Sequence, residues 1–277
     1  MAGALYLVAT PIGNLADISA RCTRTLSEAD FIAAEDTRVT MKLLNHLQLK
    51  KPLVSYYAHN RKESGERILE RLLNGETCAL VSDAGMPAIS DPGEELVAMC
   101  AAREIPVFCI PGPAAAVTAL AVSGLPTQRF TFEGFLSTAK KRRFGHLHEL
   151  KTEKRTMIFY EAPHKLLPTL TDMLAVWGDR RVSISRELTK LYEETLRTTL
   201  AEAVDHFSRV KPRGEFVLVI EGAAAEETGV SLEAAVAWVQ ALHKDGAALK
   251  DAAKLVSAET AIPKNTLYAA CLSLEEA

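Results

Sequence analysis

Apolar runs of four or five residues alternate with longer amphipathic stretches over the first 125 residues of the chain. The runs predict buried strands at residues 5–9, 30–34, 79–82 and 107–110. The helical spacing of apolar positions predicts helices at residues 18–27, 40–46, 63–74, 94–103 and 114–123. Strands that alternate with helices in this way are typical of an α/β fold with a mostly parallel sheet.

A second set of strands begins after Gly124, Leu125 and Pro126, which end the last of these helices. We expect strands at residues 129–133, 156–160, 182–186 and 215–221, and helices at residues 165–177 and 200–207. Three helix-length segments follow at residues 232–243, 249–260 and 264–274. The predicted organisation is an N-terminal α/β domain (1–125), a second α/β domain (126–224) and a small helical C-terminal segment (225–277).

The last two helical segments are joined by Ala261, Ile262 and Pro263. A short helix, a tight turn and a second helix resemble a helix-turn-helix, which would suit nucleic acid. Two packed amphipathic helices would produce the same pattern. Both interpretations stay open for this segment.

Loops rich in glycine and proline follow three of the predicted strands, at residues 10–15, 82–93 and 111–115. Residues 82–93 read S-D-A-G-M-P-A-I-S-D-P-G, and no packed core requires such a stretch. Gly85 allows the backbone to approach a ligand closely, while Asp83 and Asp91 offer acceptors. Because open parallel sheets bind ligands at the carboxyl ends of their strands, the loops predict a shared cofactor site.

Composition excludes several classes of protein. The chain has 277 residues, of which 48% are hydrophobic, and five cysteines without metal-ligand spacing, so we expect a globular protein without disulfides or structural zinc. No basic and apolar leader precedes residue 5, and the longest apolar stretch is interrupted by prolines, which predicts a cytosolic location and no membrane association. The net charge of −3 means that a polyanion would need a local basic patch.

Polar groups follow two further strands. Glu35, Asp36 and Arg38 come directly after the predicted strand 30–34, where a helix cap with a solvated ion pair is the alternative to a functional cluster. Tyr160 and Glu161 end the strand at 156–160, where they suit a purine ring and a hydroxyl, unless the segment simply feeds the next helix. No dinucleotide, P-loop, zinc-protease or serine-hydrolase motif is present in the sequence.

Basic residues are densest at Lys140, Lys141, Arg142 and Arg143, and the run continues to Arg155. A solvated helix face is the ordinary explanation of such a run. A patch that grips the phosphates of a nucleic acid is the alternative. His59 lies among aromatic and amide residues of the kind that hold unstacked bases, although an exposed loop would read the same.

The order of motifs along the chain is characteristic. V-A-T-P-I-G-N-L-A-D-I (8–18), A-A-E-D-T-R (33–38), L-V-S-D-A-G-M-P-A-I-S-D-P-G (80–93), P-G-P-A-A-A (111–116), F-Y-E-A-P-H (159–164), R-E-L-T-K (186–190) and G-E-F-V-L-V-I-E-G (214–222) closely resemble the bacterial ribosomal RNA small-subunit methyltransferase I family, within the tetrapyrrole methylase superfamily. The resemblance covers roughly residues 4–222. Its departures are mild, such as Met86 in place of the frequent Thr and Ala162 in place of the frequent Ser.

The resemblance implies two α/β domains around an S-adenosylmethionine cleft, a homodimer, and methylation of a cytidine ribose 2'-hydroxyl in the decoding region of 16S ribosomal RNA. The substrate would be the RNA or the small subunit. By motif, the cofactor contacts are Pro11, Asp83, Ala84, Gly85, Pro87, Ile89, Ser90, Pro111, Gly112, Tyr160, Glu161, Ala162 and Gly214. No metal is implied.

A ribose hydroxyl is a poor nucleophile, so a base that accepts its proton would help the reaction. Glu35 and Asp36 are the candidates, followed by His59, while Arg38 would hold either these carboxylates or a phosphate. Methylation of a tetrapyrrole ring carbon and RNA binding without catalysis are the alternatives. The basic run at Lys140, Lys141, Arg142 and Arg143 favours an RNA substrate over a macrocycle.

Overall fold

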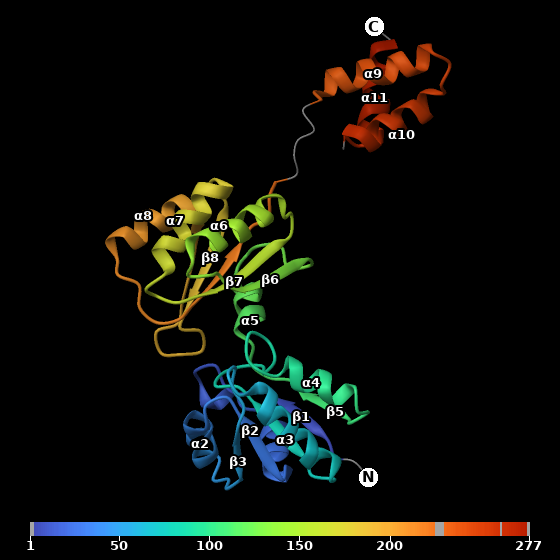
Figure 1. The fold of residues 1–277 in the computed structure, drawn as a ribbon. Helices are drawn as coiled ribbons and strands as arrows, with labels where there is room; N and C mark the ends of the chain where they lie inside the picture. The colour runs from blue at the N-terminus through green and yellow to red at the C-terminus, as the bar shows by residue number, and fades with distance from the viewer. Residues whose placement is uncertain (1–2, 225–229, 261, 276–277) are drawn as a thin grey trace. The chain divides into compact units, whose positions relative to one another are not determined.

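The computed structural model describes residues 3–224, 230–260 and 262–275, and its first 223 residues form one compact unit built on two sheets (Figure 1). The first sheet has five parallel strands in the order β3-β2-β4-β1-β5. The strands are β1 Leu5–Val8, β2 Phe31–Ala34, β3 Leu53–Ser55, β4 Cys78–Val81 and β5 Val107–Ile110. The helices that alternate with them are α1 Ala20–Glu28, α2 Thr37–His46, α3 Arg61–Leu73 and α4 Glu94–Ala101, with a short 3-10 helix, η1, at Leu15–Asp17.

Helices cover both faces of the first sheet, because alternate strand residues point to opposite sides. Phe31 and Ala33 pack with α3 and α4, whereas their neighbours Ile32 and Ala34 pack with α1 and α2. The α/β class and the parallel first sheet are therefore confirmed. Strand β3 was not anticipated, because its three partly exposed residues show no recognisable alternation.

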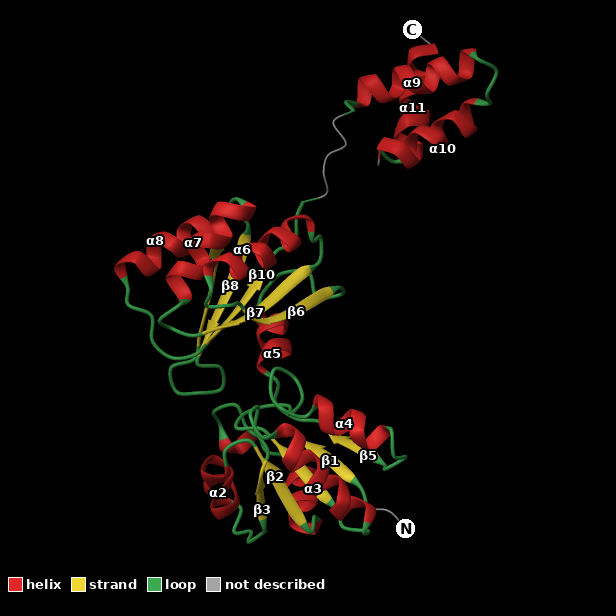
Figure 2. Cartoon of the chain, in the orientation of Figure 1, coloured by secondary structure: helices red, strands yellow, loops and turns green. Residues whose placement is uncertain are grey.

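The second sheet has the order β6-β7-β10-β8-β9, and only β6 and β7 are parallel (Figure 2). The strands are β6 Phe130–Phe135, β7 Thr156–Glu161, β8 Arg181–Arg186, β9 Glu194–Thr199 and β10 Phe216–Ile220. One face carries α6 Lys140–Glu149, α7 Leu166–Trp177 and α8 Leu200–Arg209, with a short 3-10 helix, η2, at Leu150–Thr152. Strand β9 lies at the edge of this sheet and was also missed in the sequence.

Helix α5, Ala115–Val122, packs on the other face of the second sheet. Ala116 and Ala119 contact the buried cluster that includes Ile158 of β7 and Val217 of β10. Apart from Thr118 the helix is apolar, yet only Ala116, Ala119 and Leu120 are buried, while Val117 and Val122 are exposed. By packing it belongs with the second sheet, although it precedes the predicted boundary at residue 125. That boundary stays a prediction.

The second compact unit, residues 224–277, contains α9 Leu232–Lys244, α10 Leu249–Thr260 and α11 Lys264–Glu275. Val236, Val239, Val256 and Leu267 form its core together with small residues. Ala261, at the predicted turn between the last two helices, and residues 225–229, at the predicted boundary, lie outside the described residues. No helix in the described ranges has the length and apolar character needed to cross a bilayer.

Candidate active site

The loops after β1, β2 and β4 meet at one edge of the first sheet, because parallel strands bring their carboxyl ends together. The backbone N–H of Thr10 donates to the carbonyl of Gly85 at 2.9 Å, and the N–H of Gly85 donates back at 3.1 Å. The Thr10 hydroxyl also donates to the carbonyl of Ser82 at 3.2 Å. Residues 72 or more positions apart are thereby fixed side by side.

The loop at residues 82–93 is tightly wound. Ala88 and Ser90 have φ angles of 69° and 66°, a region that side chains other than glycine seldom occupy. Such strain persists only where the surrounding structure imposes it, and it is concentrated at ligand sites. The predicted contact Pro87 is buried within this loop.

A cleft of about 910 Å³ opens beside this loop. Its wall includes nine of the predicted site residues, namely Glu35, Asp83, Ala84, Gly85, Ile89, Ser90, Tyr160, Glu161 and Ala162. Further lining residues that were not predicted as contacts include Asp91, Ala114, Ala115, Ala116, Phe132, Phe135, Ser185 and Lys190. Pro11, Pro87, Pro111, Gly112 and Gly214 lie outside this wall. Their role as cofactor contacts stays a prediction.

Three carboxylates, Glu35, Asp83 and Asp91, form a cluster in the cleft wall. Burial raises the pKa of Glu35, and the negative charges of Asp91 and Asp83 raise it further. Burial also raises the pKa values of Asp83 and Asp91. The three groups follow β2 and β4, so their proximity arises from the pairing of these strands. Within the described residues, no group of three or more His, Cys, Asp or Glu side chains is arranged to hold a metal ion.

Asp36 lies beside this cluster in a different environment. Its side chain caps α2 by accepting from the N–H of Arg38 at 2.8 Å, and its carboxylate pairs with the Arg38 guanidinium at 2.6 Å. The hydrogen bonds from Arg38 lower the pKa of Asp36 to about 2. The backbone N–H of Asp36 donates to Asp83 at 3.0 Å, so Asp36 positions the cluster. The capping interpretation of the sequence therefore describes this side chain well.

Aromatic rings make the apolar side of the cleft. The Tyr160 ring packs edge-on against Phe132 at a centroid distance of 5.0 Å and against Phe135 at 5.5 Å. Its hydroxyl accepts the backbone N–H of Ala116 at 3.1 Å, which fixes the first turn of α5 against β7. Phe132 and Phe135 were not predicted, because the sequence does not show whether an apolar strand residue faces a cleft or the core.

Glu161 is buried, and its carboxylate is already hydrogen bonded. One oxygen accepts the Thr169 hydroxyl at 2.6 Å, and the other accepts the N–H of Ala162 at 2.8 Å. These bonds anchor the start of α7 to the end of β7. Glu161 also lines the cleft, and the expectation that it accepts from a ligand hydroxyl stays a prediction.

Lys190 also lines the cleft. Its ammonium group pairs with Glu187 at 3.0 Å and with Glu215 at 2.6 Å. A Cβ atom on Gly214 would lie 2.6 Å from the side chain of Glu187, so Gly214 packs against this ion pair. The R-E-L-T-K motif contained Lys190, but a motif alone does not show which side chains face a cleft.

The other predicted residues lie elsewhere. His59 is exposed and is not part of the cleft wall. Its ring lies edge-on to Tyr57, with 6.3 Å between the ring centroids. Arg143 is largely buried, and its guanidinium donates to Asp172 of α7 at 2.7 Å. Because that charge is paired inside the protein, Arg143 is unsuited to bind phosphate, whereas Lys140, Lys141 and Arg142 are exposed.

Comparisons with known proteins bear on the family. A model described as Tetrapyrrole (Corrin/Porphyrin) Methylases matches residues 4–204. A protein from Halalkalibacterium halodurans named ribosomal RNA small subunit methyltransferase I is 52% identical over 275 residues, which cover 96% of this chain and 93% of that protein. The chain belongs to the ribosomal RNA small subunit methyltransferase I family. The resemblance seen in the motifs is thereby confirmed.

Members of this family differ in how much of the chain they match. A ribosomal RNA small subunit methyltransferase I from Thermotoga maritima is 50% identical over 220 residues, which cover 79% of this chain and 99% of that protein. Among solved structures, the uroporphyrin-III C-methyl transferase from Thermus thermophilus complexed with S-adenyl homocysteine has a TM-score of 0.56 and 18% identity. It covers 79% of this chain and 97% of its own, which shows that the fold is shared.

Proposed function

We propose that this protein transfers a methyl group from S-adenosylmethionine to the ribose 2'-hydroxyl of a cytidine in 16S ribosomal RNA. The observation that carries the proposal is the position of Glu35, a carboxylate of raised pKa in the wall of a ligand-sized cleft. Membership of the ribosomal RNA small subunit methyltransferase I family supports the same reaction class.

The residues of the cleft suit the proposed cofactor. A volume of about 910 Å³ lies within the range of small-molecule sites. The rings of Tyr160, Phe132 and Phe135 offer an apolar surface for an adenine, and the Asp83 carboxylate offers an acceptor for an ammonium group. When bound, S-adenosylmethionine supplies a methyl group on a positively charged sulfur.

Glu35 is the base that we assign to the reaction. Its carboxylate accepts the proton of the 2'-hydroxyl while the oxygen bonds to the methyl carbon and the carbon–sulfur bond breaks. A carboxylate of raised pKa holds that proton better than an ordinary one. Asp36 suits this role less because Arg38 lowers its pKa to about 2, and His59 lies outside the cleft wall.

Lys140, Lys141 and Arg142 are the groups that we propose to contact RNA near the cleft. They are exposed at the start of α6, which follows β6. Strand β6 ends at Phe135 in the cleft wall, so the start of α6 lies toward that end of the sheet. Arg38 has 87% of its side chain exposed and stays a further proposed phosphate contact.

We also propose a cytoplasmic homodimer. The loop between β8 and β9 exposes two large apolar side chains, with Leu191 and Tyr192 at 89% and 68% exposure. Exposed apolar groups of this size are typical of surfaces that bind protein. Sedimentation of the protein at several concentrations tests the dimer.

Methyl transfer to small ribosomal subunits that lack this modification tests the function. The wild-type protein should transfer one labelled methyl group per subunit, and mass mapping should place it on a cytidine ribose. The Asp83→Ala variant should lose cofactor affinity in calorimetry. A methyl group on a nucleobase instead of the ribose, or no methylation of the RNA, would contradict the proposal.

A further inference from the structure

The basic run that extends from Lys140 to Arg155 is divided between two ends of the second sheet. Helix α6 has ten residues and is therefore about 15 Å long. It begins toward the cleft and returns along the sheet, so Lys151 and Lys154 lie near the opposite end. One basic stretch of sequence thus supplies two separated groups of cations.

Strand register places further cations at that opposite end. Phe130, the first residue of β6, pairs with Thr156, the first of β7. Ile220, the last residue of β10, pairs with Met157 of β7 and with Val182 of β8. Arg129 precedes β6, Arg155 precedes β7, and Arg181 is the first residue of β8. These three arginines therefore lie at the same edge of the sheet.

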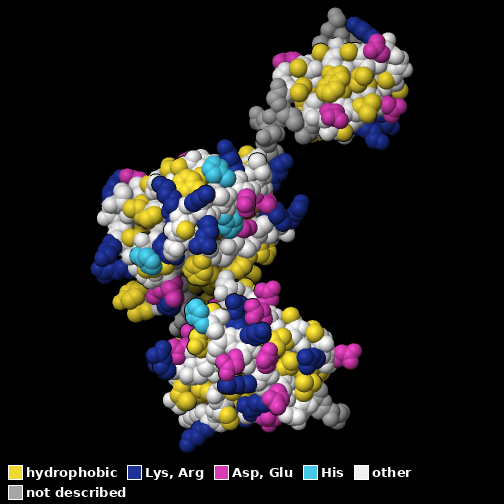
Figure 3. Space-filling view, in the orientation of Figure 1, with side chains coloured by type: hydrophobic (Ala, Val, Ile, Leu, Met, Phe, Trp, Pro, Cys, Tyr) yellow, Lys and Arg dark blue, Asp and Glu magenta, His cyan; other side chains and the backbone are white. Residues whose placement is uncertain are grey.

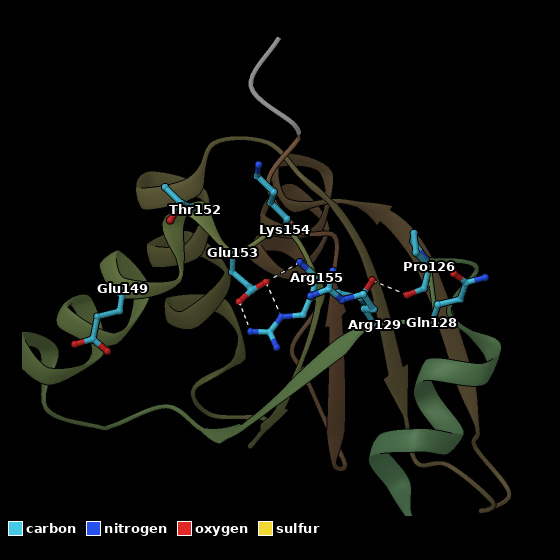
Figure 4. Close-up of a pocket in the computed structure, with 9 residues that line it drawn as sticks. Pro126, Gln128, Arg129, Glu149, Thr152, Glu153, Lys154 and Arg155 are labelled. Atoms are coloured by element: carbon cyan, nitrogen blue, oxygen red, sulfur yellow. Dashed lines mark hydrogen bonds and ion pairs between the residues drawn. The ribbon is translucent and has the colours of Figure 1, made fainter. Parts of the chain in front are cut away.

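A polar hollow of about 720 Å³ lies at this edge (Figure 4). Arg129, Lys154 and Arg155 line it together with Glu149 and Glu153. Arg155 donates to Glu153 at 2.9 Å and is neutralised there, as Figure 4 shows. In the same way Arg181 donates to Glu221 at 3.0 Å.

Three exposed cations at this edge have no acidic partner within the described residues: Arg129, Lys151 and Lys154. We call them the basic edge. Figure 3 shows Lys and Arg side chains, with Asp and Glu side chains among them, on the end of this sheet where β10 ends. The neighbouring carboxylates of Glu153 and Glu221 are paired with Arg155 and Arg181. Glu149 also lines the hollow, but it forms no ion pair with Arg129, Lys151 or Lys154 among the described residues.

The backbone that carries the basic edge is held rigidly. A Cβ atom on Gly222 would lie 2.1 Å from the carbonyl oxygen of Lys154, so only glycine allows this approach. The N–H of Ala223 donates to the carbonyl of Glu153 at 2.6 Å. The guanidinium of Arg180 donates to the carbonyl of Lys151 at 2.6 Å. Cations on an ordered backbone lose less freedom when they bind a ligand.

We propose that the basic edge binds the sugar–phosphate backbone of the RNA substrate at a point separate from the cleft. The inference rests on the proposed function, since it presupposes an RNA substrate. Strand β7 spans six residues, which separates the edge from the cleft by about 17 Å. A folded RNA is large enough to contact both places, and contacts to phosphate fix its register without reading bases.

The test compares two triple variants of the full-length protein. Arg129→Gln/Lys151→Gln/Lys154→Gln removes the basic edge. Lys42→Gln/Lys50→Gln/Lys62→Gln removes the same charge from exposed positions next to the first sheet, far along the chain from this edge. Binding to small ribosomal subunits is measured over a range of salt concentrations, and cofactor affinity is measured by calorimetry.

The basic-edge variant should bind subunits about tenfold more weakly, with a salt dependence flatter by about two to three units of log–log slope. The control variant should change both quantities by less than about twofold, and the cofactor affinity of both variants should match the wild type. Equal losses in the two variants, or no loss at the basic edge, would overturn the inference. If the wild type binds subunits without methylating them, the proposed function fails while the binding comparison still tests the basic edge.

Discussion

The side chain of Lys190 lies directly across the backbone of Gly13. A Cβ atom on Gly13 would come within 2.5 Å of the Lys190 Cγ atom. Lys190 also pairs with Glu187 and Glu215, so the loop after β1 packs against an ion-paired side chain from the loop between β8 and β9. Both residues belong to the first compact unit, and Lys190 lines the cleft together with Ile12, the neighbour of Gly13.

Substituting Gly13→Ala should lower the thermal unfolding midpoint, because the added methyl group must displace a lysine held by two carboxylates. We expect a loss of about 1–3 kcal/mol. Gly145→Ala is the matched control, since nothing lies within 4 Å of a Cβ there and alanine favours the helix. Equal midpoints for the two variants would contradict the close contact at Gly13.

Glu35→Gln should reduce the turnover number for methyl transfer by about 100-fold or more, because the amide does not accept the 2'-hydroxyl proton. Its affinity for S-adenosylmethionine should stay within about threefold of the wild type. Asp36→Asn is the control, since asparagine still caps α2. Single-turnover measurements compare the rate of methyl transfer in the two variants. A larger loss of rate in Asp36→Asn than in Glu35→Gln would assign the role of the base to Asp36.

The pH dependence of the reaction should reflect the pKa of Glu35. The carboxylate must be ionised to accept a proton, so the rate falls as the pH drops through its pKa. Burial and the negative charges of Asp91 and Asp83 raise that pKa. The midpoint of the fall in rate on the acidic side of the pH profile, its acidic limb, should therefore lie above the ordinary glutamate pKa of about 4.3.

Asp91→Asn tests the direction of the pKa shift of Glu35. Removing a negative charge near Glu35 lowers its pKa, so the acidic limb of kcat should move to lower pH. A limb that stays in place would show that Glu35 does not control it. Asp17→Asn, a carboxylate in the loop after β1 that is not part of the cleft wall, serves as the control.

Arg142 and Arg143 are neighbours in the sequence, yet their loss should have different effects. Arg143→Ala leaves Asp172 without its partner at a largely buried site and should lower stability by about 1–3 kcal/mol. Arg142→Ala should preserve stability and weaken subunit binding with a flatter salt dependence. Unfolding and binding measurements on both variants check this, and the reverse pattern would refute the division of roles.

Several elements of the fold were readable from local pattern. The apolar runs of β2 and β4 are buried on both faces, so each predicts a strand without knowledge of its partner. The runs of β1 and β5 are also continuous and apolar, although β1 is partly buried and β5 is an edge strand with two exposed residues. Strands β3 and β9 lack this signal because they are short or partly exposed edges. The direction of the strands in the second sheet was not readable, since it depends on how distant segments pair.

The sequence by itself determined the alternation of strands and helices, the loops at strand ends and the family motifs, because each is encoded in residues close together along the chain. Only the tertiary structure decided that Glu35 lies with Asp83 and Asp91, that Arg143 is paired while Arg142 is exposed, and that the basic run is divided between two ends of a sheet. The physical reason is that pKa values, ion pairs and local charge depend on distances through space. Those distances are set by strand order and helix packing between segments that are far apart in the sequence.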